Sequence, residues 1–259
     1  MNVSDVAAMG GTPAFALVTL GLRGDEQAGD IDALYEGLAE GGAAWGVAVA
    51  GGDIVRAPAM SITVALIGYA GLDASGEPLV LRRNAAHAGD VVAVTGALGG
   101  AAGGLRALQE GGDSEAARAL IERHLRPQPR LEAGRAALAA GVRCAIDVSD
   151  GLLQDLGHVC KASRLGATVW RDKLPIDPAL RELEPEEALR CAIAGGEDYE
   201  LLLAGASEQI ERLTSAFDVP VTVIGEMVID PEFQARLLDE SAREIDVPAR
   251  GWDHLQSGG

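Results

Sequence analysis

The stretch Ala-Ile-Asp-Val-Ser-Asp-Gly-Leu-Leu at 145–153 limits what this chain can fold into more than any other segment. A short apolar run leads directly into two aspartates, a serine and a glycine, and a helical apolar pattern follows at once. If residues 146–149 are extended, Asp147 and Ser149 point the same way, because side chains alternate along a strand. Asp150 is then expected at the N-cap of the next helix, and Gly151 allows another group to approach the backbone closely.

This arrangement would gather two carboxylates, one hydroxyl and several free N–H groups at one point. Such a point suits a divalent cation together with a phosphate, because carboxylates bind hard cations and helix N-termini bind anions. A simpler interpretation stays open from these residues alone. In that interpretation Asp150 only caps a helix, and Asp147 is an ordinary turn residue.

The charge of the chain narrows the possible partners. The 259 residues carry a formal net charge of −18, and 48% of them are hydrophobic but only 3% aromatic. A strongly acidic surface repels nucleic acid and anionic membranes, so we expect neither as a partner. A phosphorylated substrate remains compatible with this charge if metal ions neutralise the acids locally.

The cysteines and the apolar runs indicate a cytoplasmic protein. Cys144, Cys160 and Cys191 are odd in number and widely spaced, which is typical of reduced thiols. The N-terminus lacks the basic and then apolar pattern of a signal segment. The longest apolar run, 59–72, contains Ser61 and is too short to span a bilayer.

Apolar periodicity and turn residues predict a two-domain α/β (α+β) chain with mixed sheets flanked by helices. The polar, turn-rich segment 77–89 places the boundary near 75–88, which gives domains 1–80 and 81–259. The first residues are expected to finish a strand before Ser4 and Asp5, and 47–50 is expected to be a buried strand. The other elements we expect include strands at 14–22, 60–70, 91–95, 167–170 and 219–224 and helices at 31–45, 114–124, 130–140 and 208–217.

Four polar clusters are each predicted to follow an apolar strand: Ser4-Asp5, Gly51-Gly52-Asp53, Asp147 to Asp150, and Gly195 to Asp198. If these clusters converge, carboxylates about 4 Å apart repel each other by roughly 4 kcal/mol at an effective dielectric constant near 20. Basic residues are scarce nearby, and Arg56 and Arg83 are the candidates. Metal ions are therefore the expected compensation, and oxygen-only ligands indicate Mg²⁺.

Lysine is too rare for the usual phosphate-binding motifs. Lys161 and Lys173 are the two lysines, and neither follows a glycine-rich turn. The glycines of 96–104 therefore do not form a Walker-type loop, and we expect them to let a helix pack tightly on a sheet. Nucleotide phosphates would then be bound by Mg²⁺, backbone N–H groups and arginine. His158, one turn into the helix after Gly151, is expected to be structural.

Together these motifs resemble the thiamine-monophosphate kinase family, within the wider aminoimidazole ribonucleotide synthetase-like superfamily. The likeness runs in order along nearly the whole chain, up to Gly-Trp-Asp-His at 251–254. It is carried by Asn-Val-Ser-Asp-Val-Ala-Ala-Met-Gly at 2–10, Gly-Gly-Asp at 51–53, Val-Thr-Gly-Ala-Leu-Gly at 94–99, Arg-Pro-Gln-Pro-Arg at 126–130, Ile-Asp-Val-Ser-Asp-Gly-Leu at 146–152 and Gly-Gly-Glu-Asp-Tyr-Glu-Leu at 195–201.

The resemblance implies a two-domain superfamily fold, a homodimer, and direct in-line transfer of the γ-phosphate of ATP onto thiamine monophosphate, giving thiamine diphosphate. It implies Mg²⁺ as the cofactor and ATP as the co-substrate. Carried over position by position, the implied Mg²⁺ ligands are Asp5, Asp53, Asp147 and Asp150. The implied ATP contacts are Gly52, Asp53, Arg83 and Ser149, and the implied contacts of thiamine monophosphate are Glu197 and Trp252.

The sequence departs from the family pattern in two places. Family members begin with a further segment that carries Gly-Asp-Asp and Val-Glu-Gly-Val-His-Phe type motifs, so we expect a shortened N-terminal domain and an incomplete site. Ile54 stands where the family usually has threonine. The alternatives are therefore another enzyme of the same superfamily, or an inactive nucleotide-binding fragment.

Overall fold

The computed structural model of the chain describes residues 1–214, 216–247 and 251. These form two compact units. The larger unit comprises Met1, Val3–Gly10 and Leu79–Gly259, and the smaller unit comprises Asn2 and Gly11–Pro78. The predicted division into domains 1–80 and 81–259 stays a prediction.

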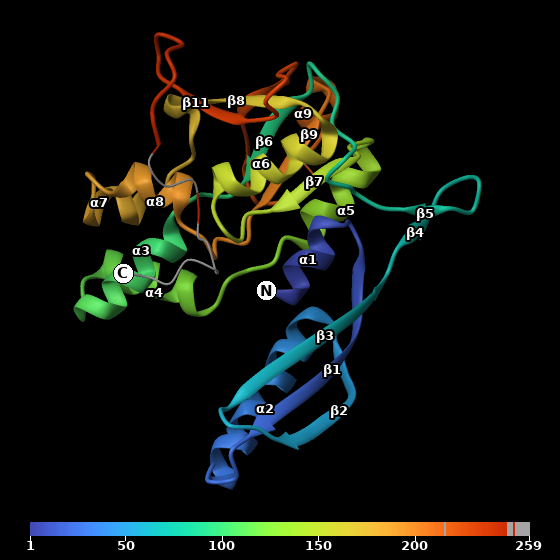
Figure 1. The fold of residues 1–259 in the computed structure, drawn as a ribbon, viewed down its shortest axis with the longest axis vertical. Helices are drawn as coiled ribbons and strands as arrows, with labels where there is room; N and C mark the ends of the chain where they lie inside the picture. Colours follow the sequence, from blue (N-terminus) through green and yellow to red (C-terminus); the bar gives the residue numbers. More distant parts are fainter. Residues whose placement is uncertain (215, 248–250, 252–259) are drawn as a thin grey trace. The chain divides into compact units, whose positions relative to one another are not determined.

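The smaller unit is built on a three-stranded mixed sheet of order β2-β1-β3. Its central strand β1 (Thr12–Leu22) runs parallel to β2 (Ala48–Arg56) and antiparallel to β3 (Ser61–Tyr69). Parallel neighbours need a crossover connection, and helix α2 (Ala28–Trp45) supplies it (Figure 1). A two-stranded ribbon of β4 (Gly71–Leu72) and β5 (Pro78–Leu79) follows.

Strand β2 corrects the prediction of a buried strand at 47–50. Every residue from Ala48 to Arg56 is exposed, because β2 is an edge strand and the described part of α2 buries no residue. Gly51, Gly52 and Asp53 lie inside this strand rather than after it. Gly52 pairs with Val18 of β1, and a Cβ at position 52 would overlap the Val18 carbonyl oxygen. Glycine is therefore needed where the two backbones approach each other.

The larger unit contains a six-stranded mixed sheet of order β11-β8-β10-β6-β9-β7. Within this sheet, only the β11–β8 pair is parallel among the pairings of described residues. This arrangement confirms the expected mixed sheets flanked by helices. The strands are β6 (Val91–Thr95), β7 (Cys144–Asp147), β8 (Gly166–Trp170), β9 (Leu201–Gly205), β10 (Val221–Val228) and β11 (Ala235–Leu238).

Helices cover both faces of this sheet. Apolar side chains point to each face, because successive side chains along a strand alternate between the two faces. Helix α6 (Leu152–Ser163) packs on β7, β8 and β11 (Figure 1). Its apolar face joins a buried cluster with Ile146, Val94 and Leu202. Helix α5 (Leu131–Ala140) contacts β9, and the short α9 (Ser207–Glu211) contacts β6. The sheet is thus buried on both faces.

A second group of helices packs beside the sheet and corrects one expectation. It contains α3 (Gly100–Glu110), α4 (Glu115–Leu125), α7 (Pro178–Leu183) and α8 (Ala188–Ala194), and a short 3₁₀ turn η1 (Arg171–Lys173) follows β8. The glycines of 99–104 allow close packing, but against α4, α7 and α8 rather than against a sheet. A Cβ at Gly104, for example, would overlap the Leu120 carbonyl oxygen of α4.

The first residues form helix α1 (Asn2–Ala8), so the expected strand before Ser4 is wrong. Its buried face consists of Ser4, Ala7 and Ala8, and Gly134 of α5 contacts the Ala7 carbonyl closely. Among the described residues, none of the helices is both long and apolar enough to cross a membrane.

Candidate functional site

Asp147 ends strand β7 and lies at the junction of the sheet with helix α1. Its side chain is only 3% exposed, and its Oδ2 atom accepts a 2.6 Å hydrogen bond from the Ser4 hydroxyl. Ser4 is itself fully buried on α1. The predicted apolar strand before Asp147 is confirmed, but β7 spans Cys144–Asp147 and therefore ends two residues before Ser149, so the expected extended stretch 146–149 is confirmed only as far as Asp147. Residues 143 positions apart in the sequence therefore meet at one buried carboxylate.

The turn after Asp147 is shaped by Asp155, a residue that sequence reasoning missed. Asp155 Oδ2 accepts the backbone N–H groups of Ser149, Asp150 and Gly151 at 2.9, 3.0 and 3.1 Å. The expected N-cap role of Asp150 is wrong, because α6 starts at Leu152 and its N-cap is Gly151. The carboxylate that satisfies these N–H groups comes from inside the helix instead.

Burial gives Asp155 an unusual electrostatic environment. Its side chain is 2% exposed, and burial raises its pKa to about 6 despite the three backbone donors, which act in the opposite direction. A signal was present in the sequence. Asp155 falls three residues after Leu152 and four before Val159, on the apolar face of α6, where an acid needs a partner.

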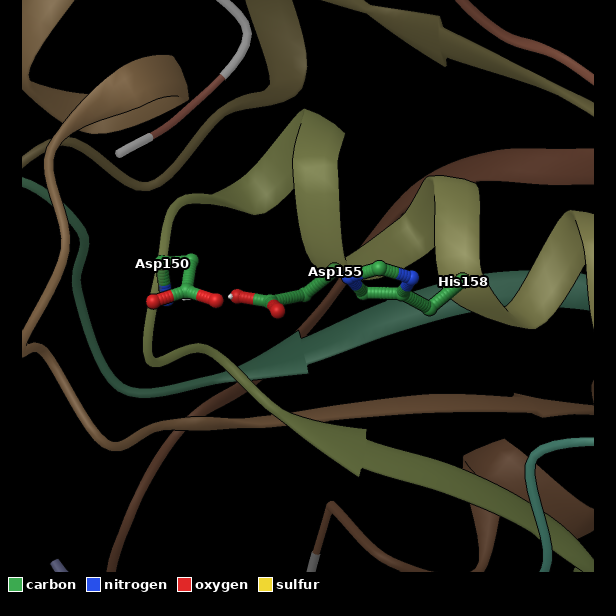
Figure 2. A group of neighbouring side chains, drawn as sticks. All are labelled: Asp150, Asp155 and His158. Carbon is green, nitrogen blue, oxygen red and sulfur yellow. Dashed lines mark hydrogen bonds between the residues drawn. The ribbon is translucent and has the colours of Figure 1, made fainter. Parts of the chain in front are cut away.

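His158 joins this group from the next turn of α6. Figure 2 shows Asp155 reaching back from α6 toward Asp150, with the His158 ring further along the helix. One ligand atom from each of Asp150, Asp155 and His158 lies within 4.8 Å of the others. Asp155 Oδ2 already accepts three N–H groups, so this oxygen serves the turn rather than a cation.

Asp5 and Asp147 form an acidic pair in the larger unit. The pKa of Asp5 is raised above its usual value, first by partial burial of its carboxyl group and then by the Asp147 carboxylate. The α-amino group of Met1 and the guanidinium of Arg83 lower it, but they do not offset the first two effects. The donor set is therefore oxygen-only and short of positive charge, which fits Mg²⁺.

The segment 195–201 pairs with the Asp147 turn along an irregular extension of the sheet. The N–H groups of Glu197 and Tyr199 donate to the carbonyls of Ser149 and Val148, both at 2.9 Å. Glu197 and Tyr199 have φ angles of 73° and 51°, which non-glycine residues adopt rarely. The Tyr199 hydroxyl donates to Glu197 Oε1 at 3.0 Å. Burial and the nearby Glu197 carboxylate raise the pKa of Tyr199.

The other two acids of this segment hold structural partners. Asp198 accepts the N–H groups of Gly99 and Ala101 at 2.6 and 3.0 Å, at the start of α3. Burial is the main reason that its pKa rises to about 7. Glu200 is 2% exposed and accepts the Thr95 hydroxyl and two N–H groups of Arg130, the last residue of the Arg-Pro-Gln-Pro-Arg motif.

A pocket of about 500 Å³ opens beside these turns in the larger unit. Its walls come from the two turns and from helices α3, α4 and α8. The turns contribute Ser149, Asp150 and Glu197, and the helices contribute Leu105, His124 and Cys191 among others. Polar groups thus gather at one side of a partly apolar cavity, as in sites for small ligands.

The structure brings most of the predicted site residues of the larger unit together. Asp5 lies beside Asp147, and Ser149, Asp150 and Glu197 line the pocket. The backbone carbonyl of Arg83 accepts the Ser163 hydroxyl at the end of α6, at 2.9 Å. Gly52 and the exposed Asp53 belong to the smaller unit. Trp252 lies outside the described residues, while its neighbour Gly251 packs closely on Gln154 and the Asp150 carbonyl.

The common setting predicted for the four polar clusters is wrong in three cases. Asp5 lies on a helix, Asp53 lies inside a strand, and Glu197 precedes β9 instead of following a strand. Only Asp147 stands at the end of an apolar strand. The side chains that meet at the pocket do so because the 195–201 segment turns back beside the Asp147 turn.

Two family models match the chain. The chain matches the model described as AIR synthase related protein, N-terminal domain, over residues 1–70. It matches the model described as AIR synthase related protein, C-terminal domain, over residues 87–237. Together the two models cover most of the chain.

Individual proteins resemble the chain along nearly its whole length. A thiamine-monophosphate kinase of Escherichia coli K12 is 38% identical over 98% of this chain and 78% of its own length. One of Bacillus subtilis 168 is 35% identical over 99% and 79%. A solved structure described as AaThiL complexed with AMPPCP and TMP matches with a TM-score of 0.84 and 28% identity, over 98% of this chain and 77% of that chain.

Proposed function

The chain belongs to the thiamine-monophosphate kinase family, and from this premise we propose how its residues carry out the reaction. It is an ATP-dependent phosphotransferase that phosphorylates thiamine monophosphate to thiamine diphosphate. The bond between the β- and γ-phosphates of ATP breaks, a bond forms between the γ-phosphorus and an oxygen of the acceptor phosphate, and ADP leaves. The relatives do not favour another activity of the superfamily.

One observation carries the assignment of the site. Asp147, which lies beside Asp5 of α1, begins the turn that carries Ser149 and Asp150, and this turn is hydrogen-bonded to the segment that carries Glu197 and lines the same pocket. Phosphoryl transfer asks a protein mainly for positioning and for neutralisation of charge. A rigid acidic turn next to a cavity of this size meets both needs for a small phosphorylated acceptor.

We propose Mg²⁺ as the cofactor, held by Asp5, Asp147 and Asp150 of the larger unit. For Asp53 of the smaller unit, a role as a metal ligand stays a prediction from the family resemblance. When bound, the metal offsets the negative charge of the two reacting phosphates. The Ser4 hydroxyl holds the Asp147 carboxylate in place from behind. The raised pKa of Asp5 supports the assignment, because carboxylates that repel each other gain most from a shared cation.

The remaining predicted residues receive roles in binding. Ser149 and Arg83 are proposed to contact ATP. For Gly52 and Asp53 of the smaller unit, contact with ATP stays a prediction from the family resemblance. Glu197 is exposed at the pocket and is proposed to face the thiamine part of the acceptor, which carries a positive charge. Trp252 is proposed as a second contact of that part, on the family resemblance alone.

The smaller unit supports a proposed homodimer. One face of its sheet exposes large apolar side chains from all three strands, namely Leu17 of β1, Val55 of β2 and Ile67 of β3. A contiguous apolar surface of this kind is typical of an interface. We also propose a cytoplasmic location, because Cys144, Cys160 and Cys191 are all buried free thiols, as expected in a reducing compartment.

The activity is tested by ADP release in a coupled assay with Mg²⁺ and ATP. We expect release to depend on thiamine monophosphate and to be absent with other small phosphate esters. Glu197→Gln should raise KM for thiamine monophosphate by about tenfold with little change in the affinity for ATP. Glu208→Gln, an exposed change on α9, is the matched control. A response to other acceptors but not to thiamine monophosphate would contradict the proposal.

A further inference from the structure

We propose that Asp155 is a positioning residue, which holds the turn 149–151 in the shape that its metal and nucleotide contacts require. This inference rests on the proposed function of that turn. It assigns a role to a buried carboxylate that contacts neither substrate in the proposed site. It also explains why an acid stands on the apolar face of α6.

Asp155 holds the turn through three hydrogen bonds to a single carboxylate oxygen. Three consecutive N–H groups, of Ser149, Asp150 and Gly151, converge on Asp155 Oδ2 at 2.9 to 3.1 Å. Three consecutive donors can reach one oxygen only if the backbone curls around it. The carboxylate therefore fixes the path of the chain through the turn, and with it the directions in which the Ser149 and Asp150 side chains leave the backbone.

Asp155 is itself held firmly in the core of the larger unit. Asp155 is 2% exposed and lies in the first turn of α6, between Leu152 and Leu156, which are fully buried. Its side chain has little freedom to move, since packed neighbours fix its position. Figure 2 shows the carboxylate extended from the helix toward the turn. The turn is thus tied to the core rather than to the surface.

Hydrogen bonds connect the turn and helix α6 to other parts of the site. The Ser149 carbonyl accepts the Glu197 N–H, so the path of the turn also sets the position of Glu197. At the far end of the same helix, Ser163 holds the carbonyl of Arg83. Helix α6 therefore supports the turn at its first residues and the Arg83 segment at its last.

The experiment compares Asp155→Ala and Asp155→Asn with the wild-type chain in two measurements. The first is hydrogen exchange of peptides covering 149–151 in the absence of metal and nucleotide. We expect exchange of these amides to rise roughly tenfold to a hundredfold in Asp155→Ala. The rise should be smaller in Asp155→Asn, because the amide oxygen can still accept some of the three bonds. Regions outside α6 and the two turns should keep their protection.

The second measurement is binding of a non-hydrolysable ATP analogue with Mg²⁺ by calorimetry. Residues that orient metal ligands typically change affinity by about 10- to 100-fold when mutated. We expect a loss of this size in Asp155→Ala and partial recovery in Asp155→Asn. The folded fraction is monitored by circular dichroism. If Asp155→Ala does not fold, the Asp155→Asn variant carries the test.

The matched control is Asp239→Asn. Asp239 Oδ1 also accepts two backbone N–H groups of a turn, those of Ser241 and Arg243, at 2.8 and 2.9 Å. That turn follows β11, at the opposite edge of the sheet from β7. Loss of the Asp239 carboxylate should speed hydrogen exchange in that turn and leave binding of the ATP analogue unchanged.

The outcomes separate this inference from the proposed function. Normal exchange at 149–151 in both Asp155 variants, or faster exchange with unchanged affinity for the analogue, would overturn the positioning role. Unchanged affinity in Asp147→Asn would instead contradict the proposed metal site. Reduced affinity in Asp147→Asn with normal affinity in the Asp155 variants would therefore remove the inference and leave the proposed function standing.

Discussion

Two acidic segments lie side by side in the larger unit and use their carboxylates differently. In the segment 197–200, Asp198 is bound to the start of α3 and Glu200 to Arg130 and Thr95. Around the neighbouring turn, Asp147 receives one neutral hydroxyl from Ser4 and stands beside the like-charged Asp5. The first set of acids is satisfied by the protein, whereas the second set leaves negative charge to be neutralised.

Because the two sets of acids differ in this way, a cluster of acids in a sequence does not by itself define a binding site. Buried carboxylates with cationic or backbone donors act as structural links, and removing the donor is costly. Carboxylates that repel each other cost stability and are retained for another reason, which here is the proposed binding of a cation. Variants of Arg130, Asp147, Ser4 and Asp198 test whether the acids of the two segments differ in this way.

The largest effect is expected when the partner of a satisfied acid is removed. Arg130→Ala leaves Glu200, which is 2% exposed, without its cation. We expect the free energy of unfolding to fall by about 3–5 kcal/mol, because a buried charge is then left uncompensated. Urea denaturation followed by circular dichroism measures the change.

The control for Arg130 is an arginine with exposed partners. Arg236 contacts Asp230, Glu232 and Glu244 at the surface. Arg236→Ala should lower the free energy of unfolding far less than Arg130→Ala does, since ion pairs near solvent contribute little. Equal losses in the two variants would contradict the contrast between buried and exposed pairs.

The opposite behaviour is expected at Asp147. Asp147→Asn removes charge from the acidic pair, so stability should stay within about 0.5 kcal/mol of the wild type or rise. Binding of Mg²⁺ with a non-hydrolysable ATP analogue should weaken by about 10- to 100-fold. Calorimetry and thermal denaturation on the same preparation give both values. A strong loss of stability with normal binding would place Asp147 among the structural acids.

A smaller effect is expected at Ser4. Ser4→Ala deletes the hydroxyl that donates to Asp147, and we expect a loss of about 1–2 kcal/mol in stability together with a weaker affinity for the analogue. Ser114→Ala is the control, because Ser114 caps α4 by accepting the Ala117 N–H. That control should cost about 1 kcal/mol. It should leave the affinity for the analogue unchanged.

Asp198 is expected to make the stability of the chain depend on pH. Burial raises its pKa from 3.8 to about 7 in the folded chain, so between these values the folded state binds more protons than the unfolded state. The contribution of this group to stability is therefore present at low pH and is lost as the pH rises through 7. Between pH 5 and pH 8, Asp198→Asn should lose less stability than the wild type. Parallel denaturation curves at both pH values would contradict this.

Local patterns predicted the elements of the fold better than their contacts. The extended run before Asp147 and the helix after Gly151 follow from periodicity within a few residues. The exposure of β2 could not be predicted, since an apolar run looks the same in an edge strand and in a buried one. The close pairing of β1 with β2 at Gly52 depends likewise on the partner strand.

The candidate site was predicted in part, for the same physical reason. Asp147, Ser149, Asp150 and Glu197 could be named from their motifs, while their proximity depends on bonds between segments about 50 residues apart in the chain. The different functions of Glu197 on one side and of Asp198 and Glu200 on the other could not be predicted, because the three acids belong to one short motif, 195–201. Their partners, such as Arg130, are fixed only by the folded structure.

The apolar sheet of the smaller unit has a consequence for how the protein behaves at different concentrations. Phe15, Leu17 and Ile67 are 41%, 42% and 50% exposed on one face of this sheet, and Asp53, a predicted nucleotide ligand, lies on the same sheet. If a second copy covers these side chains, as proposed, dilution would uncover them and loosen the strand that carries Asp53. Specific activity should then fall as the enzyme is diluted and should recover when it is concentrated again.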